Sequence, residues 1–124
     1  GIPVSMFIDP DPHQVEASAR TGAKLIELHT GRYCEAEGES EQEDDLNELI
    51  REAAHARKLG LIVNAGHGLN YDNVIPVAAI EHMNELNIGH SVIARAVIVG
   101  IEQATREMLD LVAEGTMMSP WNAD

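Results

Sequence analysis

Four short apolar runs, each followed by a helical pattern, constrain the fold of this 124-residue chain most strongly. The expected strands are residues 4–9, 24–30, 61–66 and 85–90, and the expected helices are residues 12–20, 46–58, 73–80 and 91–114. Strands joined through helices form parallel pairs with right-handed crossovers. The sequence therefore predicts an α/β chain of four consecutive βα units, half of an eight-stranded barrel. An open doubly wound sheet is the alternative, but its usual Gly-x-Gly-x-x-Gly turn is absent.

Local signals set the expected ends of these elements. Asp9 and Asp11 are two N-cap candidates for the first helix, each followed by a proline that suits a first helical position, and the helix is expected from about residue 12. Gly60 and Gly115 are expected to close the second and last helices. Residues 31–45, which hold seven carboxylates, are interpreted as a solvated acidic loop that favours the positive end of the next helix, with a cation site as the minor alternative. Residues 116–124 have no periodicity and are left unassigned.

Charge and composition narrow the class of protein. The net charge of −13, from 21 acidic and 8 basic residues, disfavours nucleic acid and anionic membranes as partners. No apolar stretch approaches the ~20 residues of a membrane span, and the start lacks a signal-peptide pattern, so a cytoplasmic protein is expected. Cys34 is the only cysteine, which excludes an internal disulfide, and it is given no role. The start at Gly1 suggests a fragment or a processed chain.

Strand alternation predicts an unusually polar interior face. The residues expected on this face are Ser5, Phe7, Asp9, Leu25, Glu27, His29, Ile62, Asn64, Glu85 and Asn87. A buried carboxylate without partners costs about several kcal/mol, so a ligand, water or a polar network should occupy the interior. The simpler alternative is that Glu27, Asn64, Glu85 and Asn87 satisfy one another and the backbone.

Two loops that follow strands carry candidate functional groups. His67 lies between Gly66 and Gly68 at the carboxyl end of the third expected strand, where barrel enzymes place catalytic groups. Gly89 and His90 precede the long last helix, whose free N–H groups suit an anion such as phosphate.

Two histidine assignments stay open at this point. His29 is as well explained by a satisfied core histidine as by a catalytic one. A metal site built from Glu27, His29, His67 and His90 is chemically feasible, since carboxylate and imidazole suit zinc or iron, but no ligand spacing is distinctive.

Several of these stretches, in this order and spacing, resemble one enzyme family. They are residues 4–9, 26–31, 60–71, 85–91 and 94–96. The chain resembles the C-terminal half of pyridoxine 5′-phosphate synthases, the enzymes that close the ring of vitamin B6. The resemblance covers most of the chain. It implies a TIM (β/α)8 barrel of which residues 1–124 form one partial domain, with the N-terminal half absent.

The resemblance also implies a reaction and roles for residues. Family members condense 3-amino-2-oxopropyl phosphate with 1-deoxy-D-xylulose 5-phosphate to pyridoxine 5′-phosphate, phosphate and water, without a metal or redox cofactor, in pyridoxal phosphate biosynthesis. By motif, His67 would be the proton donor and Glu27 would stabilise charge in the transition state. Gly68, Gly89 and His90 would bind the amino-ketone phosphate.

The resemblance further implies a homo-oligomer of complete barrels and places the family's other acid/base residues in the missing half. We therefore expect the chain alone to be inactive, and unstable or self-associating, because an open sheet leaves two strand edges unpaired. Two alternatives remain. One is a non-catalytic phosphate-binding half-barrel, and the other is a different phosphate-handling barrel enzyme, although Lys24 and Lys58 are poorly placed for Schiff-base chemistry.

Overall fold

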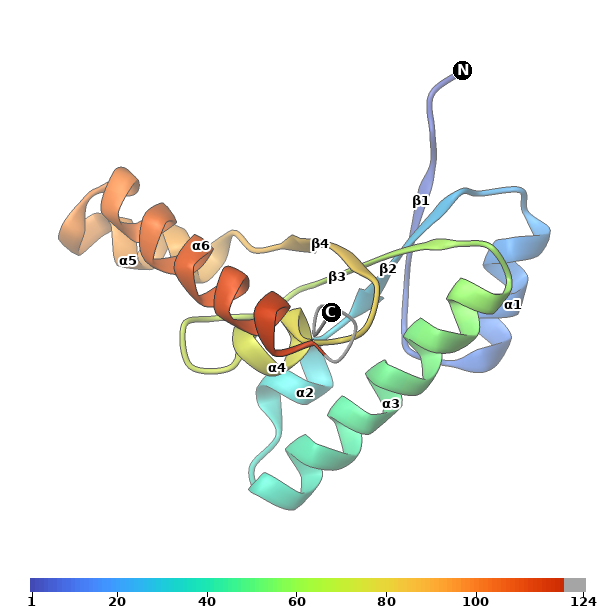
Figure 1. Cartoon of the computed structure of the whole chain (residues 1–124), viewed down its shortest axis with the longest axis horizontal. Coiled ribbons are helices and arrows are strands. Elements are labelled where there is room, and N and C mark those ends of the chain that lie inside the picture. The colour runs from blue at the N-terminus through green and yellow to red at the C-terminus, as the bar shows by residue number, and fades with distance from the viewer. Residues whose placement is uncertain (120–124) are drawn as a thin grey trace.

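The computed structural model describes residues 1–119 and shows strands and helices in alternation (Figure 1). The elements are β1 (Ser5–Ile8), α1 (Pro12–Arg20), β2 (Leu25–His29), α2 (Gly31–Glu35), α3 (Glu39–Lys58), β3 (Ile62–Gly66), α4 (Val74–Ala78), β4 (Met83–Asn87), α5 (His90–Val99) and α6 (Ile101–Met118). Within this part of the chain, β1 to β4 form one parallel sheet in sequence order. The prediction of four βα units is confirmed, and the sheet is open, as expected for half a barrel.

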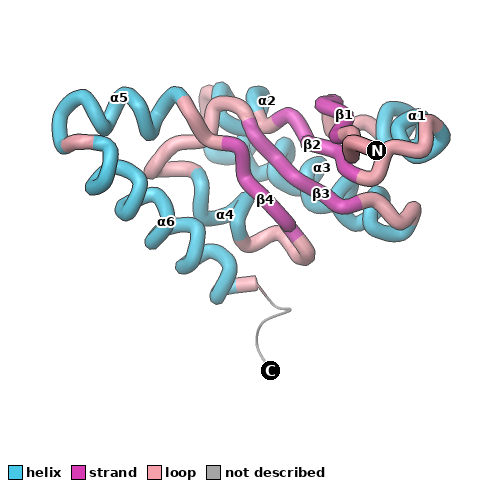
Figure 2. Tube along the Cα trace, turned by 90° about the horizontal axis from the view of Figure 1, so that it is seen from above, coloured by secondary structure: helices cyan, strands magenta, loops and turns pink. Residues whose placement is uncertain are grey.

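One face of the sheet is covered by helices and the other is bare. On β2 and β3, the side chains of Ile26, Leu28, Val63 and Ala65 are buried, and they belong to the same core cluster as residues of α1 and α3. Figure 2 looks onto the opposite face, which carries no helix within residues 1–119. This opposite face holds the alternate residues of each strand, because successive side chains point to opposite sides.

The first helix has the predicted bounds and cap. Asp11 is its N-cap, and the Asp11 carboxylate accepts a hydrogen bond from the Gln14 backbone N–H at 3.0 Å. This bond satisfies one of the N–H groups that the first turn of a helix leaves without a partner, which explains why an aspartate stands there.

The predicted acidic loop at residues 31–45 is wrong, because most of it is helical. Its start forms α2, and the carboxylates from Glu39 onward form the first two turns of α3. Asp45 is buried and pairs with Arg32 of α2 at 2.7 Å, while Glu48 pairs with the same guanidinium at 2.9 Å. Glutamate is a good helix former and carboxylates are favoured near a helix N-terminus, so acidity alone did not indicate a loop.

The single last helix predicted for residues 91–114 is also wrong. Gly100 has φ +88° and separates α5 from α6, which pack against each other and project away from the sheet (Figure 1). Arg95 of α5 pairs with Glu107 of α6 at 2.8 Å. The helix break also exposes part of the predicted apolar stripe, since Val97 is 83% exposed.

Gly115 lies inside α6 and does not end it. Ala104, Met108 and Gly115 are buried, and α6 packs on α4 through Gly115, where an added Cβ would lie 2.6 Å from the Ile75 carbonyl oxygen. Of the unassigned tail, residues 116–118 continue α6, whereas residues 120–124, which include Trp121, lie outside the described part. No helix within residues 1–119 has the length and apolar character needed to cross a membrane.

The α4–α6 contact predicts the outcome of replacing Gly115. In a helix alanine is favoured over glycine by about 1 kcal/mol, but overpacking costs about 1–3 kcal/mol. The new Cβ would also lie 2.7 Å from the Ala78 Cβ. We expect Gly115→Ala to lower the free energy of unfolding by about 1 kcal/mol in urea denaturation.

Asp110→Ala is the control, because Asp110 is exposed on the same helix and the change raises helix propensity without a clash. It should leave the free energy of unfolding equal or slightly higher. A stabilising effect of Gly115→Ala would contradict the close packing of α6 on α4.

Candidate functional site

A pocket of about 710 Å³ opens on the bare face, at the carboxyl ends of β2, β3 and β4. The residues that the sequence predicted for the site all line it: Glu27, His67, Gly68, Gly89 and His90. Phe7, Asn87 and Ser91 also contribute to its walls. The structure therefore brings the five predicted residues together, while their chemical roles remain predictions.

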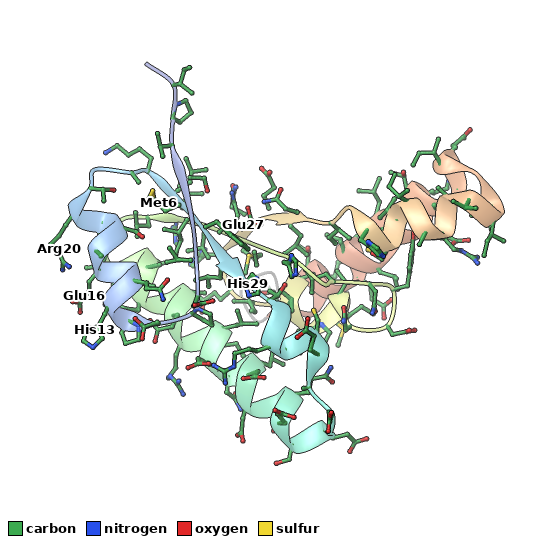
Figure 3. All side chains as sticks on the ribbon, turned by 180° about the vertical axis from the view of Figure 1, so that it is seen from behind. Met6, His13, Glu16, Arg20, Glu27 and His29 are labelled. Carbon is green, nitrogen blue, oxygen red and sulfur yellow. The ribbon has the colours of Figure 1, made fainter. Side chains whose placement is uncertain are left out.

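Strand register explains how distant residues meet at this pocket. Phe7 of β1 pairs with Glu27 of β2, Glu27 pairs with Asn64 of β3, and Asn64 pairs with Glu85 of β4. These four positions form one row across the sheet, whereas the alternation predicted only that they share one face. Figure 3 shows Glu27 on β2, away from the labelled side chains of α1.

An irregularity in the β3–β4 pairing brings Asn84, which the sequence did not indicate, into contact with Asn64. The register shifts between Val63 and Asn64, and the Asn84 amide donates to the Asn64 side-chain oxygen at 2.8 Å. This bond satisfies Asn64, which is 4% exposed. Simple alternation could not find Asn84, because a bulge changes which side chains oppose each other.

The Glu27 carboxylate is held in a defined place. The Asn87 side-chain amide of β4 donates to it at 2.8 Å. Gly66 leaves room for it, since a Cβ there would lie 2.5 Å from a Glu27 carboxylate oxygen and 2.8 Å from the Asn87 carbonyl oxygen. The interpretation that these polar side chains satisfy one another is correct for Glu27 and Asn87. Within residues 1–119, this hydrogen bond from Asn87 engages one of the two Glu27 carboxylate oxygens.

His67 adopts a backbone conformation that is unusual for a residue with a side chain. Its φ is +82°, and Gly68 follows with φ +83°. The left-handed region costs a non-glycine residue about 1–2 kcal/mol. The His67 carbonyl accepts a hydrogen bond from the Thr30 hydroxyl at 2.5 Å and a weak one from the Cys34 thiol at 3.6 Å. Contacts from the end of β2 and from α2 thus hold this turn.

The His67 imidazole lies against a second histidine. The His29 and His67 rings stack with centroids 4.7 Å apart and planes 25° apart. Phe7 contacts the His29 ring edge-on at a centroid distance of 5.1 Å. Asp9 lies on the other side, with its carboxylate 3.9 Å from His29 Nδ1. His29 is therefore neither an isolated core histidine nor part of the pocket wall.

Sequence reasoning missed Thr30 and the contact made by Cys34. Thr30 is completely buried, and a threonine directly after a strand and before a glycine was the available signal. Burial raises the pKa of the Cys34 thiol, and the Glu35 charge adds to this, while hydrogen bonds to Thr30 and Asn73 oppose it. A protonated thiol donates weakly and is a poor nucleophile, so Cys34 acts here as a contact of the His67 turn.

The other wall of the pocket is the start of α5. Gly89 is the N-cap position, and no side chain caps the first turn, so its N–H groups are available to a ligand. The Ser91 hydroxyl donates to the Leu69 carbonyl oxygen at 2.7 Å and ties this helix start to the loop after β3. Such a helix end carries partial positive charge and suits an anion.

The four side chains left open as metal ligands do not form a metal site. Within residues 1–119, no group of three or more His, Cys, Asp or Glu side chains is arranged to hold a metal ion. His29 instead uses its ring to contact His67, as described above.

Comparisons with known proteins identify the family of this chain. The sequence profile of the family described as "Pyridoxal phosphate biosynthesis protein PdxJ" matches residues 1–114. The pyridoxine 5′-phosphate synthase of Synechococcus sp. (strain JA-2-3B'a(2-13)) is 58% identical over 108 residues, which are 87% of this chain and 45% of that protein. The synthase of Gloeothece citriformis (strain PCC 7424) is 59% identical over 108 residues, again 87% of this chain and 45% of the relative.

A third relative gives the same result. The pyridoxine 5′-phosphate synthase of Syntrophotalea carbinolica (strain DSM 2380 / NBRC 103641 / GraBd1) is 55% identical over 112 residues, 90% of this chain and 47% of that protein. The chain thus spans about half the length of the curated relatives it matches. Because the profile matches nearly the whole sequence, the chain belongs to the PdxJ family of pyridoxal phosphate biosynthesis proteins.

Proposed function

We propose that this chain supplies part of the active site of a pyridoxine 5′-phosphate synthase. In this reaction 3-amino-2-oxopropyl phosphate and 1-deoxy-D-xylulose 5-phosphate condense to pyridoxine 5′-phosphate, phosphate and water. The observation that supports the proposal is a single pocket that combines His67, Glu27 and the uncapped start of α5 in a chain of this family. Its volume of about 710 Å³ is within the range of pockets for small ligands.

The proposed phosphate site lies at Gly89 and His90. None of the residues that line the pocket in the described part is Lys or Arg. The phosphate of the amino ketone would therefore be bound by the first N–H groups of α5, by the His90 side chain and by the Gly68 N–H. The helix dipole makes this favourable despite the chain's net charge of −13.

Glu27 and His67, which line the same pocket, are proposed to handle charge and protons. When the amine attacks a ketone, the carbonyl oxygen leaves as water and the nitrogen becomes an iminium cation. The Glu27 carboxylate would stabilise that positive charge. The protonated His67 ring would donate the proton that the departing hydroxyl needs to leave as water, and would itself become neutral imidazole.

The rest of the proposed enzyme lies outside this chain. The relatives are about twice as long as the matched segment, and β1 and β4 are sheet edges next to a bare face on which Phe7 is 56% exposed. We propose that further strands complete the barrel, bring the remaining acid/base groups and cover this face. Complete barrels are proposed to form a homo-oligomer in the cytoplasm.

A non-catalytic phosphate-binding half-barrel is the second candidate. It is favoured by one observation: the proposed anion-binding elements lie in this chain, whereas a complete barrel needs further strands. Family membership disfavours an unrelated phosphate-handling barrel enzyme.

A chimera tests the proposed reaction. In it, this chain replaces the matching segment of the Synechococcus relative, and pyridoxine 5′-phosphate formation is measured. We expect activity, and we expect His67→Asn to lower kcat by about 100-fold or more, because general acid catalysis contributes about 10²–10⁴-fold.

His13→Asn is the matched control for this substitution. His13 is exposed on α1, away from Glu27 and His29 (Figure 3), so activity should not change. Unchanged turnover of the His67→Asn chimera would refute the assigned role. A chimera that binds the amino-ketone phosphate but never turns over would favour the phosphate-binding candidate.

The isolated chain should behave differently from the chimera. Since unpaired strand edges invite association with other chains, we expect the 124-residue chain alone to lack synthase activity and to be unstable or self-associating. Light scattering after size-exclusion chromatography and the same product assay measure this. A stable monomer with activity near that of the chimera would contradict the expectation.

A further inference from the structure

The backbone turn at His67 must be held by neighbouring residues, because a histidine by itself disfavours a positive φ. A residue with a side chain at φ +82° persists only where surrounding contacts determine its conformation. Glycine would adopt the same turn without strain. Because histidine carries a strain here that glycine would not, other groups must hold the backbone.

Thr30 provides the contacts that hold this backbone. Its hydroxyl lies 2.7 Å from the Gly66 carbonyl oxygen and 2.5 Å from the His67 carbonyl oxygen, so one buried donor serves two successive carbonyls. The Thr30 backbone N–H also donates to Gly66 at 2.9 Å. Thr30 is fully buried, so water cannot take the place of its hydroxyl.

His29, the residue before Thr30, contacts the imidazole itself. The His29 ring reaches the ring of His67, while the Thr30 hydroxyl reaches the His67 backbone. The stacked His29 ring is in turn contacted edge-on by Phe7 and approached by Asp9. The His67 ring thereby packs against a ring that has further contacts of its own.

We propose that Thr30 and His29 are positioning residues that together aim the His67 imidazole into the pocket. Thr30 fixes the left-handed turn, and His29 supports the ring from behind. The catalytic consequence rests on the proposed synthase function, but the structural consequence does not. Neither residue is proposed to exchange a proton with substrate.

The chimera carries the test, with substitutions that separate the hydroxyl from the volume of the side chain. Thr30→Val keeps the shape and removes the hydroxyl, whereas Thr30→Ser keeps the hydroxyl. Because a misplacement of about 1 Å can cost about 100-fold in rate, we expect Thr30→Val to lower kcat by about 10- to 100-fold. The KM of the Thr30→Val chimera should change by less than about threefold. The kcat of the Thr30→Ser chimera should stay within about threefold of the value for the unsubstituted chimera.

His29 is tested in the same way. His29→Phe keeps a ring that can stack but has no nitrogen, and His29→Ala removes the ring. We expect His29→Ala to lower kcat and His29→Phe to retain most of it. If both variants lose the same activity, His29 takes part in the chemistry and the positioning role is overturned. If Thr30→Val does not fold, the two His29 variants still test the proposal. His29 is partly exposed, so a substitution there disturbs the fold less than one at the buried Thr30.

Ser18→Ala controls for the loss of a buried hydroxyl. Ser18 is 2% exposed and donates to the Gln14 carbonyl oxygen at 2.8 Å within α1, far in the sequence from the pocket loops. Ser18→Ala should lower the thermal stability of the chimera without lowering its kcat at a temperature where the protein is folded. If Thr30→Val changes only stability, as Ser18→Ala does, the proposal is overturned.

A readout without turnover separates this proposal from the proposed function. NMR couplings and chemical shifts of the His67 backbone report whether φ stays positive. We expect Thr30→Val to move His67 out of the left-handed region and Thr30→Ser to retain it. An inactive chimera that shows this shift would reject the synthase assignment and support the positioning role. A Thr30→Val chimera in which His67 keeps its original conformation would overturn the positioning role of Thr30.

Discussion

The two-residue period of β2 is the constraint on which both the core and the pocket depend. Ile26 and Leu28 must be buried under the helices, so Glu27 and His29 are placed on the bare face of the sheet. A one-residue slip of this strand would exchange the two sets, placing a carboxylate in the core and aliphatic side chains at the pocket. The hydrophobic packing that stabilises the sheet thereby also fixes the register of the polar side chains.

Much of this arrangement could be predicted from the sequence because it follows from short-range rules. Alternation placed Glu27 and Asn64 on one face of the sheet, and the Asp11 cap candidate stands where the structure begins α1. The loop between Gly66 and Gly68 was recognised because glycine on both sides of a polar residue marks a tight turn at the end of a strand. These features depend on neighbours within a few residues.

The errors concern interactions that join distant segments. The ion pair of the buried Asp45 with Arg32 depends on the packing of α2 against α3, and a count of charges in the sequence cannot show this contact. The role of Thr30 depends on carbonyl groups 36 and 37 residues away. Gly100 was visible in the sequence, but the apolar period on both sides of it suggested one continuous helix. For the acidic segment, a tertiary contact decided between local structures of similar propensity.

The order of the strands has a consequence for how the chain loses structure. Each strand pairs only with its neighbours in sequence, so the sheet resembles a linear array in which disruption enters from the two ends. Fraying of β1 or β4 removes one row of hydrogen bonds, whereas opening the β2–β3 pair requires both sides to yield. The stacked His29 and His67 rings belong to this central pair. Amide protons at the ends of β2 and β3 should therefore exchange with solvent more slowly than those of either edge strand.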